Sequence, residues 1–147
     1  MGMKEIQDSQ NLYWMLIQVA FRAKHGLMKL AEEHDLTVMQ LYTLCTMVPR
    51  EPIPMNTISC MLFCDASNVT GIVERLFAQG YIVREEKPED RRVKMISLTL
   101  KGEKLRKELL IALEQYELPE FKGLSASQQD DLKSLLAVIL ESPQLKS

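Results

Sequence analysis

Basic side chains are concentrated in one segment of this 147-residue sequence, between Arg84 and Lys107. The segment contains nine Lys and Arg residues and five Asp and Glu residues, so its net charge is +4, whereas the rest of the chain carries −6. A basic segment on an acidic chain is typical of local binding to a polyanion. A solvated charged loop would have the same charge, so the surrounding pattern must decide between the two.

Cysteine and histidine are the other residue types that could do chemistry. Cys60 and Cys64 lie four residues apart, and an oxidant-sensing thiol is one interpretation of them. Cysteine more often packs as a small apolar residue, and no base stands at a recognisable spacing. His25 and His34 have no clustered Cys or His partners with zinc-site spacing. We therefore expect no bound metal, no cofactor and no enzymatic activity. A thiol-based redox protein is the least favoured alternative.

The elements that position these residues follow from hydrophobic periodicity. Apolar residues at steps of three and four predict one long helix from about Gln7 to Glu33. Thr37 can cap a second helix that runs to about Val48, before prolines at 49, 52 and 54 break the chain. The residues expected to face inward from this second helix are Leu41, Leu44, Cys45 and Val48.

Two short helices joined by a tight turn are predicted next. The first spans about 57–63, and the second spans 66–79, with Asp65 as its N-cap and Gly80 at its C-terminal end. The buried face of the second helix has the spacing expected of core residues: Val69, Ile72, Val73 and Leu76. This arrangement is a helix-turn-helix unit.

A β-hairpin and two further helices complete the predicted order. The β runs are 81–86 and 93–99, and the turn between them is the charged stretch 87–92. Thr99 can cap a long helix, and Ser125 with Gln128 has the spacing of a capping box for the last helix. That last helix carries a narrow apolar stripe: Leu132, Leu135, Leu136 and Ile139.

Together these motifs resemble the MarR family of winged helix-turn-helix transcription regulators. The resemblance spans roughly residues 55–105 and is most specific at Asp-x-Arg (Asp90, Arg92) followed by Leu-Thr-x-x-Gly (98–102). It implies a mainly α fold with a small β-hairpin wing, in which one domain covers 1–147. Within that domain, residues 1–34 and 102–147 would form dimerisation helices, and residues 36–101 the DNA-binding lobe.

The resemblance makes the helix at 66–79 a candidate for insertion into the major groove. Small polar residues near a helix N-terminus can read base edges there. The candidates for base contacts are Ser67, Asn68 and Thr70, and Arg75 is the candidate for a phosphate. Helix capping is the alternative role of Ser67 and Asn68. Gly71 departs from the longer polar residue usual in the family and could permit close approach to DNA.

The resemblance assigns Arg92, at the hairpin tip, to the minor groove, with Asp90 orienting its guanidinium as a bidentate pair. Arg91, Lys87 and Lys94 are candidates for flanking phosphates. A solvated turn with a weak surface ion pair is the alternative interpretation.

The terminal helices are too long and too apolar for the small lobe alone. In the family, two chains interlock through them as a homodimer, which implies a pseudo-palindromic double-stranded operator. The expected function is a sequence-specific regulator, most often a repressor, released by an oxidant or a small aromatic effector. A winged-helix protein-interaction module that does not read DNA is the alternative, and such a module would have no need of a basic wing.

Length and composition set the remaining limits. The chain is 46% hydrophobic and 26% charged. Such a composition is typical of one globular domain. The longest apolar stretch, Leu12 to Phe21, is about half of what a bilayer-spanning helix requires, so no membrane partner is expected. Three cysteines indicate a reducing compartment, and we expect a cytoplasmic protein.

Overall fold

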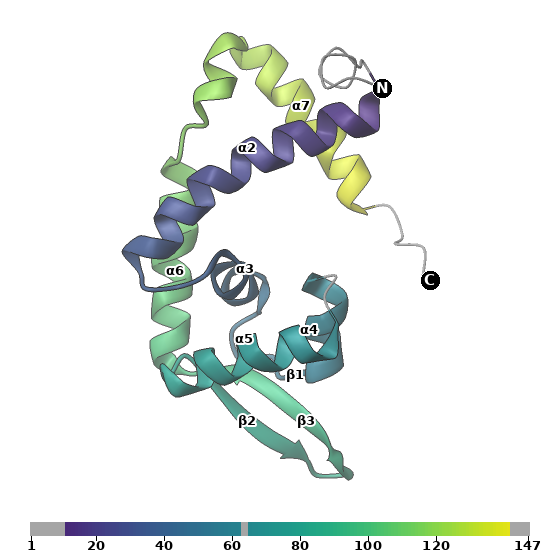
Figure 1. Cartoon of the computed structure of the whole chain (residues 1–147), viewed down its shortest axis with the longest axis vertical. Helices are drawn as coiled ribbons and strands as arrows, with labels where there is room; N and C mark the ends of the chain where they lie inside the picture. Colours follow the sequence, from purple (N-terminus) through teal and green to yellow (C-terminus); the bar gives the residue numbers. More distant parts are fainter. Residues whose placement is uncertain (1–10, 63–64, 142–147) are drawn as a thin grey trace. The chain divides into compact units, whose positions relative to one another are not determined.

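The computed structural model describes residues 11–62 and 65–141, apart from the side chain of Glu120. The chain divides into two compact units, Met1–Gln115 and Tyr116–Ser147. The elements of the described residues are α2 (Leu12–Glu33), α3 (Val38–Thr46), β1 (Ile53–Pro54), α4 (Met55–Leu62), α5 (Ala66–Ala78), β2 (Ile82–Lys87), β3 (Asp90–Leu98), α6 (Leu100–Gln115), the 3-10 helix η1 (Pro119–Gly123) and α7 (Ala126–Glu141) (Figure 1). The predicted fold class, mainly helical with a small hairpin, is confirmed.

The second predicted helix forms but ends early. The Thr37 hydroxyl accepts the Gln40 backbone N–H at 3.2 Å, and the Gln40 side chain accepts the Thr37 N–H at 2.9 Å. A full capping box therefore starts α3. The helix stops at Thr46, and Val48 is exposed rather than inward as predicted. The reason is Pro49, because a proline disfavours helical backbone at the residue before it. Leu41 and Leu44 are buried as predicted.

A short strand replaces part of the predicted proline-rich break. Ile53 and Pro54 form β1, which pairs antiparallel with β3 and places Ile53 opposite Ile96. The sheet order is β1-β3-β2, so the proline lies on an edge strand, where its missing N–H costs no ladder hydrogen bond. The following helix, α4, begins at Met55, two residues before the predicted start.

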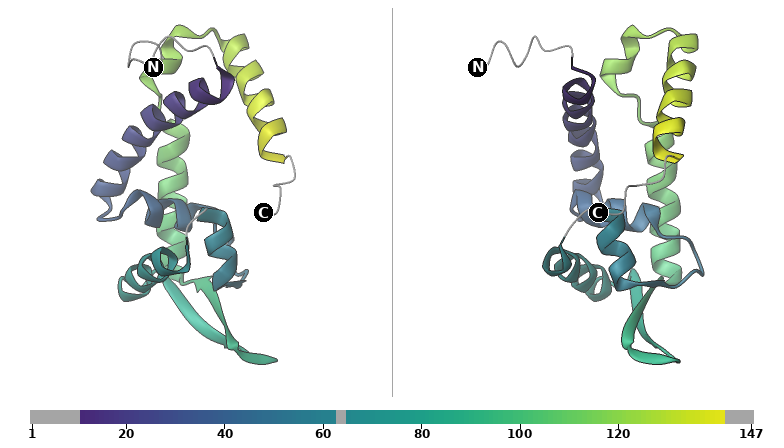
Figure 2. Two further views of the ribbon diagram at one scale, coloured as in Figure 1. Left: turned by 45° about the vertical axis from the view of Figure 1, so that its right-hand side comes forward. Right: turned by 90° about the vertical axis from the view of Figure 1, so that its right-hand side faces the viewer.

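The hairpin is longer, and its turn shorter, than the sequence predicted. β2 and β3 pair from Ile82↔Leu98 outward, with an irregularity between Glu86 and Lys87. The turn consists of two residues, 88 and 89, so residues 90–92 belong to β3 and not to the turn. Cross-strand pairs stabilise strands that extend past a core. One such pair is the ion pair of Lys94 with Glu86 at 2.7 Å. The hairpin therefore extends as an arm away from the helices of its unit (Figure 2).

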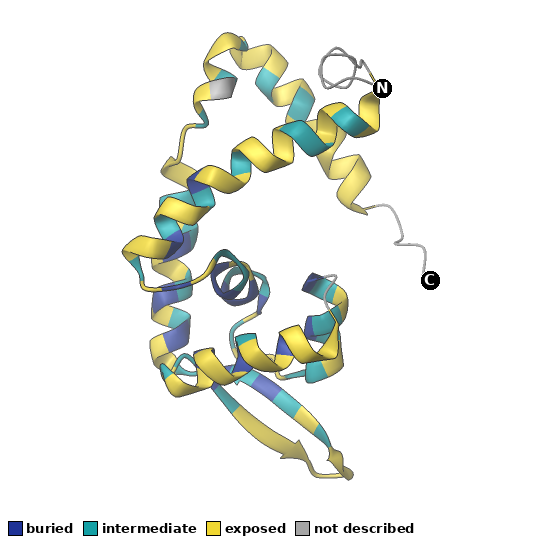
Figure 3. Ribbon diagram, viewed as in Figure 1, coloured by how far each residue is buried: buried dark blue, intermediate teal, exposed yellow. Residues whose placement is uncertain are grey.

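The core of the first unit lies where α3, α5, α6 and the base of the hairpin meet (Figure 3). Its fully buried side chains come from these four elements and from α4, and they include Leu44, Ile58, Val73, Ile96 and Leu109. The outer part of the hairpin is exposed throughout residues 84–92. The core of the first unit thus includes only the base of the hairpin.

Two helices leave large apolar side chains exposed. On α2, Leu12 and Phe21 are 81% and 71% exposed, and none of the described residues of α7 is buried. The predicted capping box of α7 is present, since the Ser125 hydroxyl accepts the Gln128 N–H at 3.2 Å and the Gln128 side chain accepts the Ser125 N–H. Residues 7–10, where the first helix was predicted to begin, lie outside the described residues. No described helix combines the length and apolar character that crossing a membrane requires.

Candidate nucleic-acid interface

Both ends of α5 are fixed by local hydrogen bonds. At its N-terminus, the Asp65 carboxylate accepts the Asn68 backbone N–H at 3.0 Å and the Ser67 hydroxyl at 2.9 Å. These bonds favour the ionised form and lower the pKa of Asp65. At the C-terminus, Gly80 has φ +76° and the Tyr81 N–H donates to the Leu76 carbonyl. These are the features of a Schellman motif. The helix start and end predicted at Asp65 and Gly80 are confirmed.

The outward face of α5 presents short polar side chains to solvent. Three of the four predicted core residues are buried, and Ile72 is half-buried. The predicted contact residues of this helix are all exposed: Ser67, Asn68, Thr70, Gly71 and Arg75. The Thr70 hydroxyl already donates to the Ala66 carbonyl at 2.9 Å. The Ser67 and Thr70 hydroxyls therefore have acceptor lone pairs to offer, whereas the Asn68 amide can both donate and accept.

Arg92 lies on the exposed outer part of the hairpin with its side chain 95% exposed. The Asp90 Oδ1 atom accepts the Arg92 backbone N–H at 3.0 Å and lies 3.6 Å from the Arg92 Nε atom. The two side chains do not form the bidentate pair that was expected, because one carboxylate oxygen serves both the backbone and the guanidinium. Asp90 thus fixes the backbone at Arg92 and leaves most of the guanidinium to solvent.

The other basic residues of the hairpin differ in how available they are. Lys87 and Arg91 are exposed. Lys94 is also exposed but is paired with Glu86 at 2.7 Å, so a phosphate would have to displace that carboxylate.

A network of contacts connects the hairpin base to α6 and explains the Leu-Thr-x-x-Gly motif. The Thr99 hydroxyl donates to the Gly80 carbonyl at 2.6 Å and accepts the Gly102 N–H at 3.0 Å, which caps α6 as predicted. A Cβ atom at Gly102 would lie 2.0 Å from the Tyr81 carbonyl oxygen, so only glycine fits. Lys101 donates to the Gln79 carbonyl and lies over the Tyr81 ring.

In the sequence, Lys101 and Arg84 stand out only as positive charges. In the structure, both contact the α5 segment: Lys101 at Gln79, and Arg84 at Glu74 and Phe77. These contacts join residues 10 and 22 positions apart. No local spacing signal marks such pairs, so the sequence could not have assigned them.

The two described cysteines, Cys45 and Cys60, differ in burial. Burial raises the pKa of the Cys45 thiol, although Arg106 acts in the opposite direction. Cys45 therefore stays protonated at neutral pH, and a protonated thiol is a poor nucleophile. Cys60 is exposed on α4, and Cys64 lies outside the described residues. Over residues 11–62 and 65–141, no three His, Cys, Asp or Glu side chains gather into a potential metal site.

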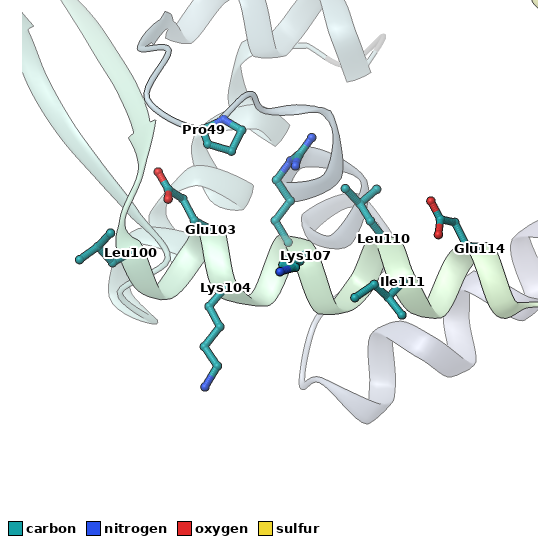
Figure 4. A pocket seen from close by; sticks show the side chains of 9 residues that line it. Pro49, Leu100, Glu103, Lys104, Lys107, Leu110, Ile111 and Glu114 are labelled. Carbon is teal, nitrogen blue, oxygen red and sulfur yellow. The ribbon is translucent and has the colours of Figure 1, made fainter.

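An open cavity of about 650 Å³ lies along α6, and Pro49 also lines it (Figure 4). Its apolar lining consists of Pro49, Leu100, Leu110 and Ile111. Three cations, Lys104, Arg106 and Lys107, and two acids, Glu103 and Glu114, complete the lining. The cavity combines apolar surface with a net positive charge.

A capped helix with an outward polar face, preceded by a short helix and followed by a hairpin with an exposed arginine, defines a winged helix-turn-helix protein. The family model described as MarR family matches residues 25–94. Over these residues the chain is similar to the MarR family.

Individual relatives show the same similarity. The uncharacterized HTH-type transcriptional regulator YkoM of Bacillus subtilis is 26% identical over 133 residues, which cover 90% of this chain and 86% of the relative. The regulator SarZ of Staphylococcus saprophyticus is 29% identical over a region that covers 71% of this chain and 70% of the relative. Among solved structures, apo MarR from E. coli has the same fold, with a TM-score of 0.80 at 23% identity over 90% of this chain and 98% of that one.

Proposed function

We propose that this chain is a DNA-binding transcription regulator, not an enzyme, and that it represses by occupying promoter DNA. The observation that carries the proposal is the 95% exposed Arg92 side chain on an arm that adds little to the core. A permanently charged group held out in this way is suited to the narrow minor groove. The relatives named as transcriptional regulators support the same function.

In this proposal α5 is the recognition helix and enters the major groove. Its exposed short polar side chains, Ser67, Asn68 and Thr70, contact base edges, and Arg75 contacts a phosphate. Gly71 allows the helix backbone to approach the duplex. On the hairpin, Lys87, Arg91 and Lys94 neutralise phosphates beside the minor groove, and Asp90 holds the backbone at Arg92.

We propose a homodimer formed through the terminal helices. The exposed apolar side chains of α2 and of α7 need cover, since soluble monomers rarely expose large apolar patches. A second copy of the chain would supply that cover and would place two recognition helices on successive turns of a pseudo-palindromic operator.

Release from DNA would follow when a ligand favours a dimer whose recognition helices no longer match the groove spacing. The cavity along α6 has the composition to take a small aromatic acid, with apolar walls and the cations Lys104, Arg106 and Lys107. An oxidant acting on Cys60 or Cys64 is the other candidate signal, for which the exposure of Cys60 is the supporting observation.

Arg92→Ala tests the proposed function. We expect it to weaken operator binding by about 1–3 kcal/mol, which is typical of the loss of one groove contact. Binding of the unmodified chain should also weaken steeply with salt, with a slope in log–log form near −0.9 per neutralised phosphate. Fluorescence anisotropy with a labelled duplex measures both.

The matched control is Lys122→Ala, which removes an exposed cation from η1. It should leave the affinity unchanged. Equal affinities for the Arg92 and Lys122 variants, or a binding curve that ignores salt, would contradict the proposal.

A further inference from the structure

One guanidinium connects α5 to the hairpin. The Arg84 Nη1 atom, on β2, lies 2.5 Å from the Glu74 Oε1 atom on α5. The Arg84 Cζ atom also lies 4.3 Å from the centre of the Phe77 ring, about one helical turn further along α5. The side chains of Arg84 and Glu74 are 32% and 53% exposed, so the contact forms at the surface and not in the core.

This contact lies where a small shift would change the angle of the hairpin. Ile82, Leu98 and Ile96 are buried, and Ile96 lies opposite Arg84, whereas residues 84–92 are exposed, so core packing holds the hairpin no further out than the Arg84–Ile96 pair. Glu89 lies five residues beyond Arg84, about 16 Å along the strand at roughly 3.3 Å per residue. A tilt of about 10° at Arg84 would therefore move the tip by about 3 Å.

Arg84 also neutralises an acid on the recognition helix. Glu74 is exposed on α5, and a free carboxylate there would repel the phosphates of a bound duplex. The guanidinium pairs with that carboxylate while it also lies over the Phe77 ring, an arrangement that a lysine ammonium does not reproduce.

We propose that Arg84 is a positioning residue for DNA recognition, which sets the angle between the recognition helix and the hairpin through Glu74 and Phe77. This inference rests on the proposed function, since the angle matters only if both elements engage one duplex. A direct contact of Arg84 with a phosphate is the competing role. The positioning role and the phosphate contact predict different binding by variants of Arg84 and Glu74.

The first readout needs no DNA. Residual dipolar couplings report the orientation of β2 and β3 relative to α5 in the free protein, and we expect Arg84→Lys to change that orientation or average it. The same variant, which keeps the positive charge, should bind the operator about tenfold more weakly. Unchanged couplings together with unchanged affinity would overturn the proposal.

The second readout is a double-mutant cycle with Glu74→Gln and Arg84→Gln. The double variant should bind better than Arg84→Gln alone, because it removes the carboxylate that the single variant leaves unpaired. If the affinity changes of the two single variants simply add up in the double variant, and Arg84→Gln lowers the salt slope by about one phosphate, then Arg84 is a phosphate contact. That result would overturn the positioning role.

Failure of the proposed function would look different. If the unmodified chain binds no duplex at low salt, both the proposed function and the role of Arg84 in DNA recognition are wrong. Changed couplings in Arg84→Lys would still show that the contact of Arg84 with Glu74 and Phe77 orients the hairpin. Thermal unfolding of each variant, expected to stay close to that of the unmodified chain, checks that the affinity changes do not come from unfolding.

Discussion

Gly71 is the residue of α5 for which the fold gives no reason. A Cβ atom there would meet nothing within 4 Å, and α5 continues without interruption through this position. Glycine inside a helix costs about 0.5–1 kcal/mol relative to alanine. In the proposed function, this cost is offset by close approach of the helix to DNA.

Gly71→Ala should therefore separate stability from binding. We expect the free energy of unfolding to rise by about 0.5–1 kcal/mol in chemical denaturation, because alanine favours the helix. The added methyl group has free space around it. Operator affinity should fall in the same variant. A variant that is more stable and binds equally well would remove Gly71 from the interface.

Asp65 makes the start of α5 sensitive to acid. Its pKa is lowered by the bonds from the Asn68 N–H and the Ser67 hydroxyl, below the ordinary value of 3.8. A group whose pKa is lower in the folded state stabilises the protein above its unfolded pKa and loses that contribution as the pH falls through the folded value. The contribution is thus present at neutral pH and lost in acid.

Asp65→Asn keeps a capping oxygen but cannot titrate. The stability advantage of the unmodified chain over this variant should shrink as the pH falls from about 5 to about 2, while the other carboxyl groups titrate alike in both proteins. Denaturant titrations across that range measure it. Parallel stability curves would show that Asp65 does not contribute as its contacts indicate.

At the scale of elements, the sequence predicts well what depends on local chemistry. The caps at Thr37, Asp65, Thr99 and Ser125 and the end at Gly80 were all predicted, because each needs a particular residue type within three or four positions. The end of α3 was placed too late despite the local signal of Pro49, and the other failures depend on pairing across distance. The β1 strand exists only because β3 lies beside it, and β3 continues to Asp90 because β2 pairs with it.

The candidate site follows the same division. The exposure of the candidate residues of α5 follows from the helical period around Val69, Val73 and Leu76, which the sequence contains. The contacts of Arg84, and the single-oxygen geometry of Asp90 with Arg92, follow from how the hairpin twists and packs. Periodicity carries no information about either.

A substitution at Gly102 tests the contact between the hairpin base and α6. Gly102→Ala should destabilise the fold by about 1–3 kcal/mol, because an overpacked methyl group forces the backbone to shift. The group it would overlap is the Tyr81 carbonyl. Gly123→Ala is the control, since a Cβ atom there meets nothing within 4 Å. Chemical denaturation measures both, and similar losses in the two variants would contradict the tight contact at Gly102.

For the whole molecule, the distributions of apolar surface and of charge both favour a dimer that binds DNA. Many of the large apolar side chains that the first unit leaves exposed lie on α2, and the described residues of α7 are all at least partly exposed, so both helices are suited to a partner copy. The positive segment 84–107 includes the arm, whereas the rest of the chain is acidic, which favours contact with DNA through that segment.

The proposal of a dimer that binds DNA is tested most directly by measuring how many recognition helices bind one operator. Selection of binding sites from a random-sequence duplex pool, followed by hydroxyl-radical footprinting of the winning sequence, measures it. A dimer that reads two grooves predicts an inverted repeat with half-sites about 10–10.5 base pairs apart, centre to centre. A single half-site without symmetry, or no enriched sequence at low ionic strength, would contradict it.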